Sequence, residues 1–301
     1  MKRDTRIAWR RTPLASLNLQ GTRVAVIGGT GGLGRAISRA LAGRGANVIV
    51  VGQTFRDADV RGIEFVRADL SSMREAARVA RALPAEALDL VVFTTGIFAA
   101  PTRQETPEGI ERDTAISYLS RYVMLREMAP RLGKERSGPL KPRVFVMGYP
   151  GRGQAGTFAD LNAEASYNAY AVHMNTVAGN EILVLDAAGR YPHATFFGLN
   201  PGLIKTNIRD NFLGAGSLRS RVAEYLISLF APTPEQYADR VAPLLVAPEI
   251  ESHSGAMFNQ KGQAILPTPA LLNQTHASGF LAASEQLVSR ATGRATSTGA
   301  G

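Results

Sequence analysis

The chain has 301 residues, 45% of them hydrophobic, which is enough for one large core. It contains no cysteine, so disulfides, thiolate nucleophiles and thiolate metal sites are excluded, and a reducing cytoplasm fits this composition. The net charge of +9 favours anionic ligands, but the basic residues lie scattered without interleaved aromatic residues, which argues against nucleic-acid binding. The four histidines show no metal-ligand spacing, so no metal site is expected.

Residues 1–20 are expected to form an N-terminal arm. The arm begins with basic residues, but the continuous apolar run that an export signal requires does not follow them. No other stretch reaches the about 20 apolar residues that span a membrane, so no membrane partner is expected. Five apolar residues could dock the arm on the rest of the protein: Ile7, Trp9, Leu14, Leu17 and Leu19.

A glycine-rich turn, Gly28-Gly29-Thr30-Gly31-Gly32-Leu33-Gly34, follows the first expected strand and leads into an expected helix. Glycine accepts positive φ and lets backbone N–H groups approach a pyrophosphate, while the N-terminus of a helix favours negative charge. Strand, turn and helix together predict dinucleotide binding. The alternative for such a glycine cluster is a turn that binds nothing.

Short apolar strands alternate with helical patterns along most of the chain. Strands are expected at residues 23–27, 47–51, 63–66, 88–93, 143–147 and 194–199. Helices are expected at 32–44, 71–82, 107–131 and 164–189. This alternation predicts an α/β fold with a doubly wound parallel sheet, a Rossmann arrangement in a single domain. Ligands are then expected at the carboxyl ends of the strands.

Over about residues 20–265 the chain resembles the short-chain dehydrogenase/reductase family. The family's glycine motif is present at Gly28, Gly32 and Gly34, with Ile27 in the place of its threonine. Three later segments stand at cofactor-binding places of the family: Asp69-Leu70 at the adenine, Thr95-Gly96 after the fourth strand, and Pro201-Gly202 with Thr206 at the nicotinamide. The resemblance implies that these segments hold the cofactor together with Thr30 and Leu33 of the turn. The matching final strand is expected around residues 254–258.

The catalytic positions depart from the family. Tyr170 stands where the family has its catalytic tyrosine, but Met174 occupies the place of the lysine four residues later. In the family that lysine lowers the pKa of the tyrosine and holds the nicotinamide ribose. Without it, Tyr170 is expected to be a slow proton donor, though still a hydrogen-bond donor. Met174 then fills a lysine-sized space with apolar bulk beside the cofactor.

Three other residues are candidates for the catalytic apparatus. Ser117 stands where the family has a helix asparagine, and Tyr149 stands where it has a substrate-binding serine. His173 follows Tyr170 by three residues, so both side chains can share one helix face, and imidazole can shuttle protons near neutral pH. The alternatives are that His173 completes a polar corner of the helix surface and that Tyr149 forms an aromatic wall of the pocket.

Cofactor preference depends on the end of the second strand. An enzyme that uses NAD usually carries an acidic residue there for the ribose 2′-hydroxyl, and here that place is Gly52. Gln53, Thr54 and Arg56 could instead contact a 2′-phosphate, so NADP is preferred over NAD. The alternative for Arg56 is a solubilising surface residue.

The region after Thr206 is expected to shape the substrate pocket. The family resemblance implies a lid at about 207–231, where residues 217–230 carry apolar side chains at helical spacing. A lid of this kind suggests an apolar small-molecule substrate, and the alternative is a helix that simply packs on the core. Residues 266–301 form a C-terminal extension with a tail that is expected to be disordered. The family resemblance also implies a homo-oligomer, a dimer or a tetramer, built through the two long helices.

Three functional classes follow from these observations. The first is an NADPH-dependent reductase of a carbonyl group, with Tyr170 donating the proton and Tyr149 or Ser117 orienting the oxygen. The second is a cyclase or isomerase that reuses the pocket, and the third is a nucleotide-binding protein without turnover. The first is favoured because Pro201-Gly202 and Thr206 would have little use without a nicotinamide ring.

Overall fold

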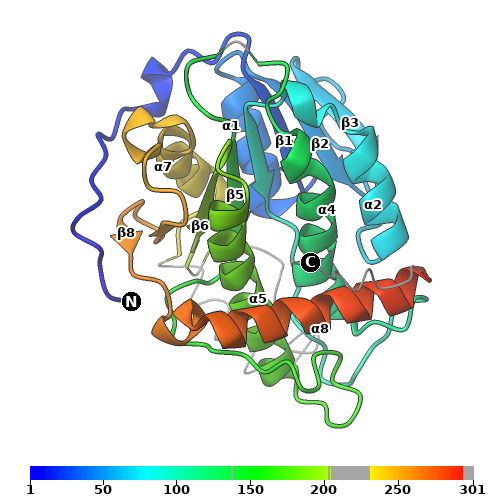
Figure 1. The fold of residues 1–301 in the computed structure, drawn as a ribbon. Helices are drawn as coiled ribbons and strands as arrows, with labels where there is room; N and C mark the ends of the chain where they lie inside the picture. The colour runs from blue at the N-terminus through cyan, green and yellow to red at the C-terminus, as the bar shows by residue number, and fades with distance from the viewer. Residues whose placement is uncertain (137, 203, 205–230, 294–301) are drawn as a thin grey trace.

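The computed structural model describes residues 1–136, 138–202, 204 and 231–293, and its centre is a twisted β-sheet (Figure 1). Within these residues eight strands have the order β3-β2-β1-β4-β5-β6-β7-β8. Their neighbours run parallel except for β8, which is antiparallel to β7. The strand bounds are β1 Arg23–Ile27, β2 Asn47–Gly52, β3 Ile63–Arg67, β4 Leu90–Phe93, β5 Arg143–Met147, β6 Thr195–Leu199, β7 Met257–Phe258 and β8 Ala264–Ile265. The expected doubly wound α/β fold is confirmed.

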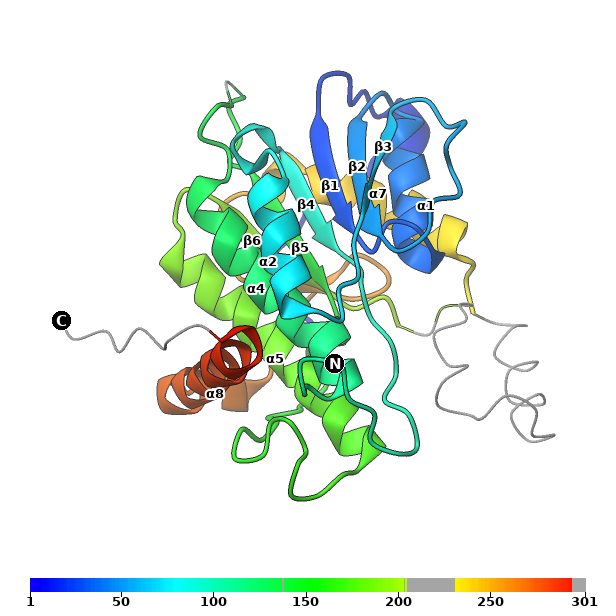
Figure 2. The same cartoon turned by 90° about the vertical axis from the view of Figure 1, so that its right-hand side faces the viewer.

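Helices cover both faces of the sheet, as Figure 2 shows. One layer contains α1 (Gly32–Ala42) and α7 (Pro234–Val246), which pack on each other. The other contains α2 (Met73–Ala82), α4 (Ser120–Met128) and α5 (Ala169–Arg190), and α8 (Gln274–Thr292) lies across the outside of this layer. Successive side chains of β1 alternate between the two cores that these layers enclose. The central strands β1, β4, β5 and β6 are mostly apolar because both of their faces are buried, whereas the edge strand β3 carries Glu64 and Arg67 and is partly exposed.

Strand β1 pairs with β2 on one side and with β4 on the other. The strand order therefore reverses at β1, and the crossover helices leave a crevice at the carboxyl ends of β1 and β4. This is the place where open α/β sheets bind their ligands. The topology thus puts the glycine turn after β1 and residues Thr94–Gly96 after β4 on the same crevice.

Two long helices begin later than the sequence pattern predicts. The helix expected from residue 107 begins as α3 (Arg112–Thr114), because the Glu111 carboxylate caps the backbone N–H groups of Asp113 and Thr114. A π-helical turn, Ala115–Leu119, then joins α3 to α4, and a 3₁₀ turn, Ala129–Arg131, follows. The helix expected from residue 164 begins at Ala169 after Asn168, its N-cap.

The delay before α5 has a local cause. The carboxylate of Asp160 accepts hydrogen bonds from the backbone N–H groups of Glu164, Ala165 and Ser166, which holds this segment in a loop. Helices α7 and α8 were not among the predicted elements. Four further 3₁₀ turns lie at Leu14–Ser16, Ala85–Ala87, Pro248–Ile250 and Pro269–Leu272.

The N-terminal arm runs along the outer edge of the sheet (Figure 1). Arg3 forms a β-bridge with Ile265 of β8, and the Asp4 N–H donates to the carbonyl of Ala264. The indole N–H of Trp9 donates to the carbonyl of Gly262 over 2.6 Å. The apolar residues of the arm join the core that contains α1 and α7. The arm therefore covers a sheet edge that would otherwise stay open.

Several expectations fall outside the residues that the structure describes. They are Thr206, the proposed lid at 207–231 apart from Ala231, and the tail beyond Gly293. Among the described helices, none is both long enough and apolar enough to cross a bilayer.

Candidate dinucleotide and catalytic site

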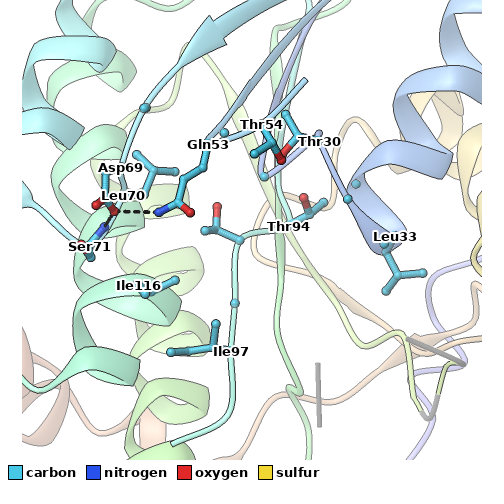
Figure 3. Close-up of a pocket in the computed structure, with 18 of the residues that line it drawn as sticks. Thr30, Leu33, Gln53, Thr54, Asp69, Leu70, Ser71, Thr94, Ile97 and Ile116 are labelled. Atoms are coloured by element: carbon cyan, nitrogen blue, oxygen red, sulfur yellow. Dashed lines mark hydrogen bonds between the residues drawn. The ribbon is translucent and has the colours of Figure 1, made fainter. Parts of the chain in front are cut away.

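A pocket of about 450 Å³ opens at the carboxyl ends of β1, β2 and β4 (Figure 3). It is lined by five segments that the fold brings together from separate parts of the chain. Most of the expected cofactor residues line it: Gly28, Thr30, Gly32, Leu33, Gly34, Gln53, Thr54, Asp69, Leu70, Thr95 and Gly96. Ile97, Arg112 and Ile116 also line the pocket, although the sequence analysis did not select them.

The glycine turn is shaped for close approach of a ligand to the backbone. Gly28 has φ +90°, and a Cβ there would lie 2.7 Å from the backbone nitrogen of Thr95. A Cβ at Gly34 would overlap the carbonyl oxygen of Gly28. By contrast, Gly31 borders open space and is the N-cap of α1, where no side chain caps the helix. The first N–H groups of α1 are thus left for an anion such as a pyrophosphate.

At the adenine end, two side chains lie across the mouth of the pocket (Figure 3). The Gln53 amide donates to Oδ1 of Asp69 over 3.1 Å, and the Ser71 N–H donates to the same oxygen over 3.0 Å. Burial alone would raise the pKa of Asp69, but these hydrogen bonds outweigh it and hold that pKa below its usual value. Asp69 is therefore ionised and fixed at neutral pH.

Gly52, where an NAD-using relative would carry an acid, has no room for any side chain. A Cβ there would overlap Oγ1 of Thr30 and lie 2.9 Å from its Cγ2. Thr30 therefore fills the space of the missing carboxylate, and Thr54 lines the same pocket. Arg56 is exposed and is not among the lining residues.

The candidate catalytic side chains lie on α5 and in the loop after β5, and none of them is among the residues that line this pocket. Tyr170 is in the first turn of α5 and is 61% exposed, while Met174, one turn later, is half-buried. Tyr149 is half-buried, and the Arg152 guanidinium lies over its ring at 4.9 Å from the centroid. Such a cation–π contact orients the Tyr149 ring.

His173 and Ser117 are joined through a residue that the sequence analysis did not select. Asp113 Oδ2 lies 2.8 Å from Nδ1 of His173, and Asp113 Oδ1 accepts a 2.5 Å hydrogen bond from the Ser117 hydroxyl. Ser117 also accepts a hydrogen bond from the Ile97 N–H over 2.9 Å. Ser117 lies on the π-helical turn, a feature that is frequent at functional sites.

A buried arginine stands one turn beyond Ser117. The Arg121 guanidinium donates to the carbonyls of Thr95 and Met147, at the ends of β4 and β5, and to Asn180 Oδ1 over 3.1 Å. Burial lowers the pKa of Arg121 to about 9, and the charge of Asp113 opposes this effect. Asp113, Ser117 and Arg121 are spaced four residues apart, and this polar stripe in an apolar helix was the signal available in the sequence.

Residues 200–202, which follow β6, are held by hydrogen bonds of Asn200 and by close packing at Gly202. Asn200 Oδ1 accepts a hydrogen bond from the Gly202 N–H over 3.0 Å, and its amide donates to the carbonyl of Pro150. Gly202 has φ +69°, and a Cβ there would lie 3.0 Å from the Gln260 side chain. Pro201-Gly202 is therefore held beside the loop after β5, which contains Tyr149.

Known proteins share both the sequence pattern and the fold. Residues 22–140 match the family model described as short chain dehydrogenase. An uncharacterized oxidoreductase of Saccharomyces cerevisiae, YKL107W, is 50% identical over 295 residues, which cover 96% of this chain and 95% of the relative. Polyprenol dehydrogenase of Mus musculus is 27% identical over 272 residues, which cover 81% of this chain and 78% of the relative.

Among solved structures, a protein from Mycobacterium paratuberculosis superimposes with a TM-score of 0.65 at 18% identity, covering 93% of this chain and 98% of its own. At that identity the likeness concerns the fold alone. The sequence relatives show kinship beyond the fold, because the yeast oxidoreductase aligns with nearly the whole chain at 50% identity. The chain therefore belongs to the short-chain dehydrogenase/reductase family, whose members bind nicotinamide dinucleotides and act on small molecules.

Proposed function

We propose that this protein is an NADP(H)-dependent oxidoreductase that reduces the carbonyl group of an apolar small molecule. The observation that carries the proposal is the geometry of the pocket at β1 and β2. Its glycines approach a ligand through backbone alone, the first turn of α1 carries no acidic residue, and Thr30 fills the space of an acid at position 52. NADP(H), which carries a 2′-phosphate on the adenosine ribose, suits this set of groups better than NAD(H), which has a free 2′-hydroxyl there.

When bound, NADPH supplies the hydride, and the residues of this chain position the reactants and provide the proton. The glycine turn would hold the pyrophosphate, and Asp69 and Leu70 would border the adenine, since all of them line the pocket. Met174, which lies outside that lining, would add apolar contact at the nicotinamide ribose. Pro201-Gly202, held by Asn200, packs on the nicotinamide ring.

At the substrate, Tyr170 donates a proton to the oxygen as the carbonyl carbon is reduced. Tyr149, oriented by Arg152, donates the second hydrogen bond to that oxygen. The Ser117 hydroxyl already donates to Asp113, so its role in the proposal is to hold Asp113 and Ile97 in place.

An apolar substrate is supported by the lining and by one relative. Ile97 and Ile116 form the end of the pocket away from the adenine (Figure 3), and Phe98 follows directly. The mouse relative is named for polyprenol, a long apolar alcohol. A hydrophobic aldehyde, ketone or the corresponding alcohol is therefore the class of substrate to test first.

The proposal is tested by calorimetry with NADPH and NADH at matched salt, followed by turnover measurements on a panel of apolar aldehydes and ketones. NADPH-selective binding and NADPH oxidation are expected. Tyr170→Phe should lower kcat by about 10²-fold or more and leave NADPH affinity unchanged. The absence of binding to either dinucleotide would contradict the proposed function, and unchanged turnover by Tyr170→Phe would contradict the role of Tyr170 alone.

A further inference from the structure

A buried carboxylate, that of Asp113, contacts α5, the helix that also carries the proposed catalytic tyrosine. Asp113 is fully buried, and in the described part of the chain its ion-pair partner is His173 rather than a lysine or an arginine. A buried carboxylate without a partner is costly, and here the imidazole nitrogen 2.8 Å away supplies that partner. Arg121 contributes positive charge from farther away.

The contact with Asp113 also fixes the orientation of the imidazole. Because Nδ1 faces the carboxylate, Nδ1 carries a proton in either charge state, and Nε2 is the nitrogen that gains and loses the second proton. The Phe98 ring lies against the imidazole with its centroid 4.2 Å away. The ring is therefore held on one face by apolar contact and at one edge by charge.

His173 occupies a place from which a proton can reach the site. It follows Tyr170 by three residues, so the two side chains leave α5 on neighbouring positions of one face. Asp113 and Phe98 line a second pocket of about 200 Å³, which shares Ile97 and Arg112 with the dinucleotide pocket. The His173 side chain is 17% exposed, which leaves it a route to solvent.

We propose that His173, held by Asp113, returns to Tyr170 the proton that the tyrosine gives to the substrate, and so replaces the proton relay of the missing lysine. This inference rests on the proposed carbonyl reduction. It assigns His173 as the relay and Asp113 as the residue that positions it. The family lysine cannot serve, because Met174 stands in its place.

The proton balance is simple. Hydride from NADPH forms the new C–H bond, the π electrons of the carbonyl move to oxygen, and that oxygen takes the phenolic proton of Tyr170. The phenolate then takes the Nε2 proton of the imidazolium, directly or through one water, and His173 regains a proton from solvent. An imidazolium is ordinarily a stronger acid than a phenol, so a phenolate can take its proton.

The other titratable groups near the pair are few. Glu111 lies just before α3, and burial raises its pKa, so it adds less negative charge than an exposed glutamate would. The phenol of Tyr167 is hydrogen-bonded to the carbonyl of Ala100, and burial and the nearby carboxylates raise its pKa. Arg112 lines the second pocket with Asp113, Arg121 adds positive charge, and Tyr170 lies three residues before His173.

The charge pairing can be tested without cofactor or substrate. The imidazole Cε1–H resonances are followed by NMR against pH in the wild type and in Asp113→Asn, with His173→Gln to assign the His173 signal. We expect the midpoint of the His173 titration to move to lower pH in Asp113→Asn, because the negative charge that favours the imidazolium is gone. An unchanged midpoint would overturn the assignment of Asp113.

The relay is tested by the pH dependence of reduction. In the wild type, kcat should fall as pH rises between about 5 and 8, because the imidazolium is the proton donor. His173→Gln should lower kcat by about tenfold or more and abolish this dependence, while NADPH affinity stays unchanged. His193→Gln is the control, since His193 is an exposed histidine that contacts the carbonyl of Ala129 rather than Asp113.

The outcomes separate the two proposals. A wild-type profile retained by His173→Gln would overturn the relay and leave the reductase standing. Failure of the wild-type protein to bind NADPH would overturn the proposed function, and with it the relay, even if NMR bears out the pairing of His173 with Asp113.

Discussion

At the scale of single residues, the pair formed by Gly52 and Thr30 controls the shape of the cofactor pocket. The Thr30 side chain lies where any side chain at position 52 would begin. Threonine is branched at Cβ and has few rotamers, so it cannot easily move aside. An acid at position 52 and a threonine at position 30 therefore exclude each other.

This exclusion predicts the behaviour of two variants. Gly52→Asp alone should lower stability by about 1–3 kcal/mol through overpacking. Gly52→Asp combined with Thr30→Gly should restore most of that stability and shift binding from NADPH toward NADH, because the new carboxylate repels a 2′-phosphate. Calorimetry with both dinucleotides measures the shift, with Thr30→Gly as the control. Undiminished NADPH selectivity in the double variant would contradict this account of the pocket.

At the scale of elements, the loop after β2 is fastened to α1 by charge. The buried carboxylate of Asp57 accepts hydrogen bonds from Arg35 over 2.7 Å and from Arg39 over 2.7 Å. Hydrogen bonds from Arg35, and then from Arg39, outweigh the effect of burial and lower the pKa of Asp57. Both arginines are at least one-third exposed, so solvent screens much of this attraction.

The lowered pKa gives a stability prediction with a definite sign. Because the folded pKa of Asp57 lies below the unfolded one, its stabilisation is complete at neutral pH and is lost as pH falls through the folded value. Asp57→Asn should therefore lower the free energy of unfolding by about 1 kcal/mol at pH 7 and by less as the solution is acidified below about pH 4. Urea denaturation at a series of pH values checks this. A difference that stayed constant down to pH 3 would rule out the charge as its source.

At the scale of the whole molecule, the N-terminal arm joins the two ends of the chain. It adds to the edge at β8 and packs on α1 and α7, so the first residues are part of the same folded unit as the last strands. Trp9 is the only tryptophan of the sequence, and its indole N–H donates a hydrogen bond to the carbonyl of Gly262. Its fluorescence therefore reports the docking of the arm specifically.

If the arm is part of the cooperative unit, the Trp9 fluorescence transition in urea should coincide with the transition followed by far-UV circular dichroism. Trp9→Phe keeps the ring contact and loses one hydrogen bond, so it should lower stability by about 1 kcal/mol. Trp9→Ala should cost about 2 kcal/mol or more, because the ring contacts are lost as well. A fluorescence transition at clearly lower urea would mean that the arm detaches independently.

Much of the fold was predictable because its signals are local. Strands β1 to β6 were recognised from their own apolar runs, and the glycine turn from the residues beside it, whereas the two-residue strand β8 was not predicted. The late starts of α3 and α5 were missed, since capping by Glu111 and loop formation by Asp160 compete with helical periodicity over only a few residues. Most of the residues expected to bind a cofactor follow the turn or a strand end and line one pocket for the same reason, and their binding of a cofactor stays a prediction.

The sequence alone determined the doubly wound sheet, the glycine turn and the absence of a lysine at position 174, because these depend on residues that are neighbours in the chain. Tertiary structure decided what lies around the catalytic side chains. His173 and Asp113 are 60 residues apart, and Trp9 and Gly262 are 253 apart. Such contacts depend on how α3 packs on α5 and on how the sheet closes at β8. No local pattern encodes those packings, since one amphipathic helix can be covered by many others.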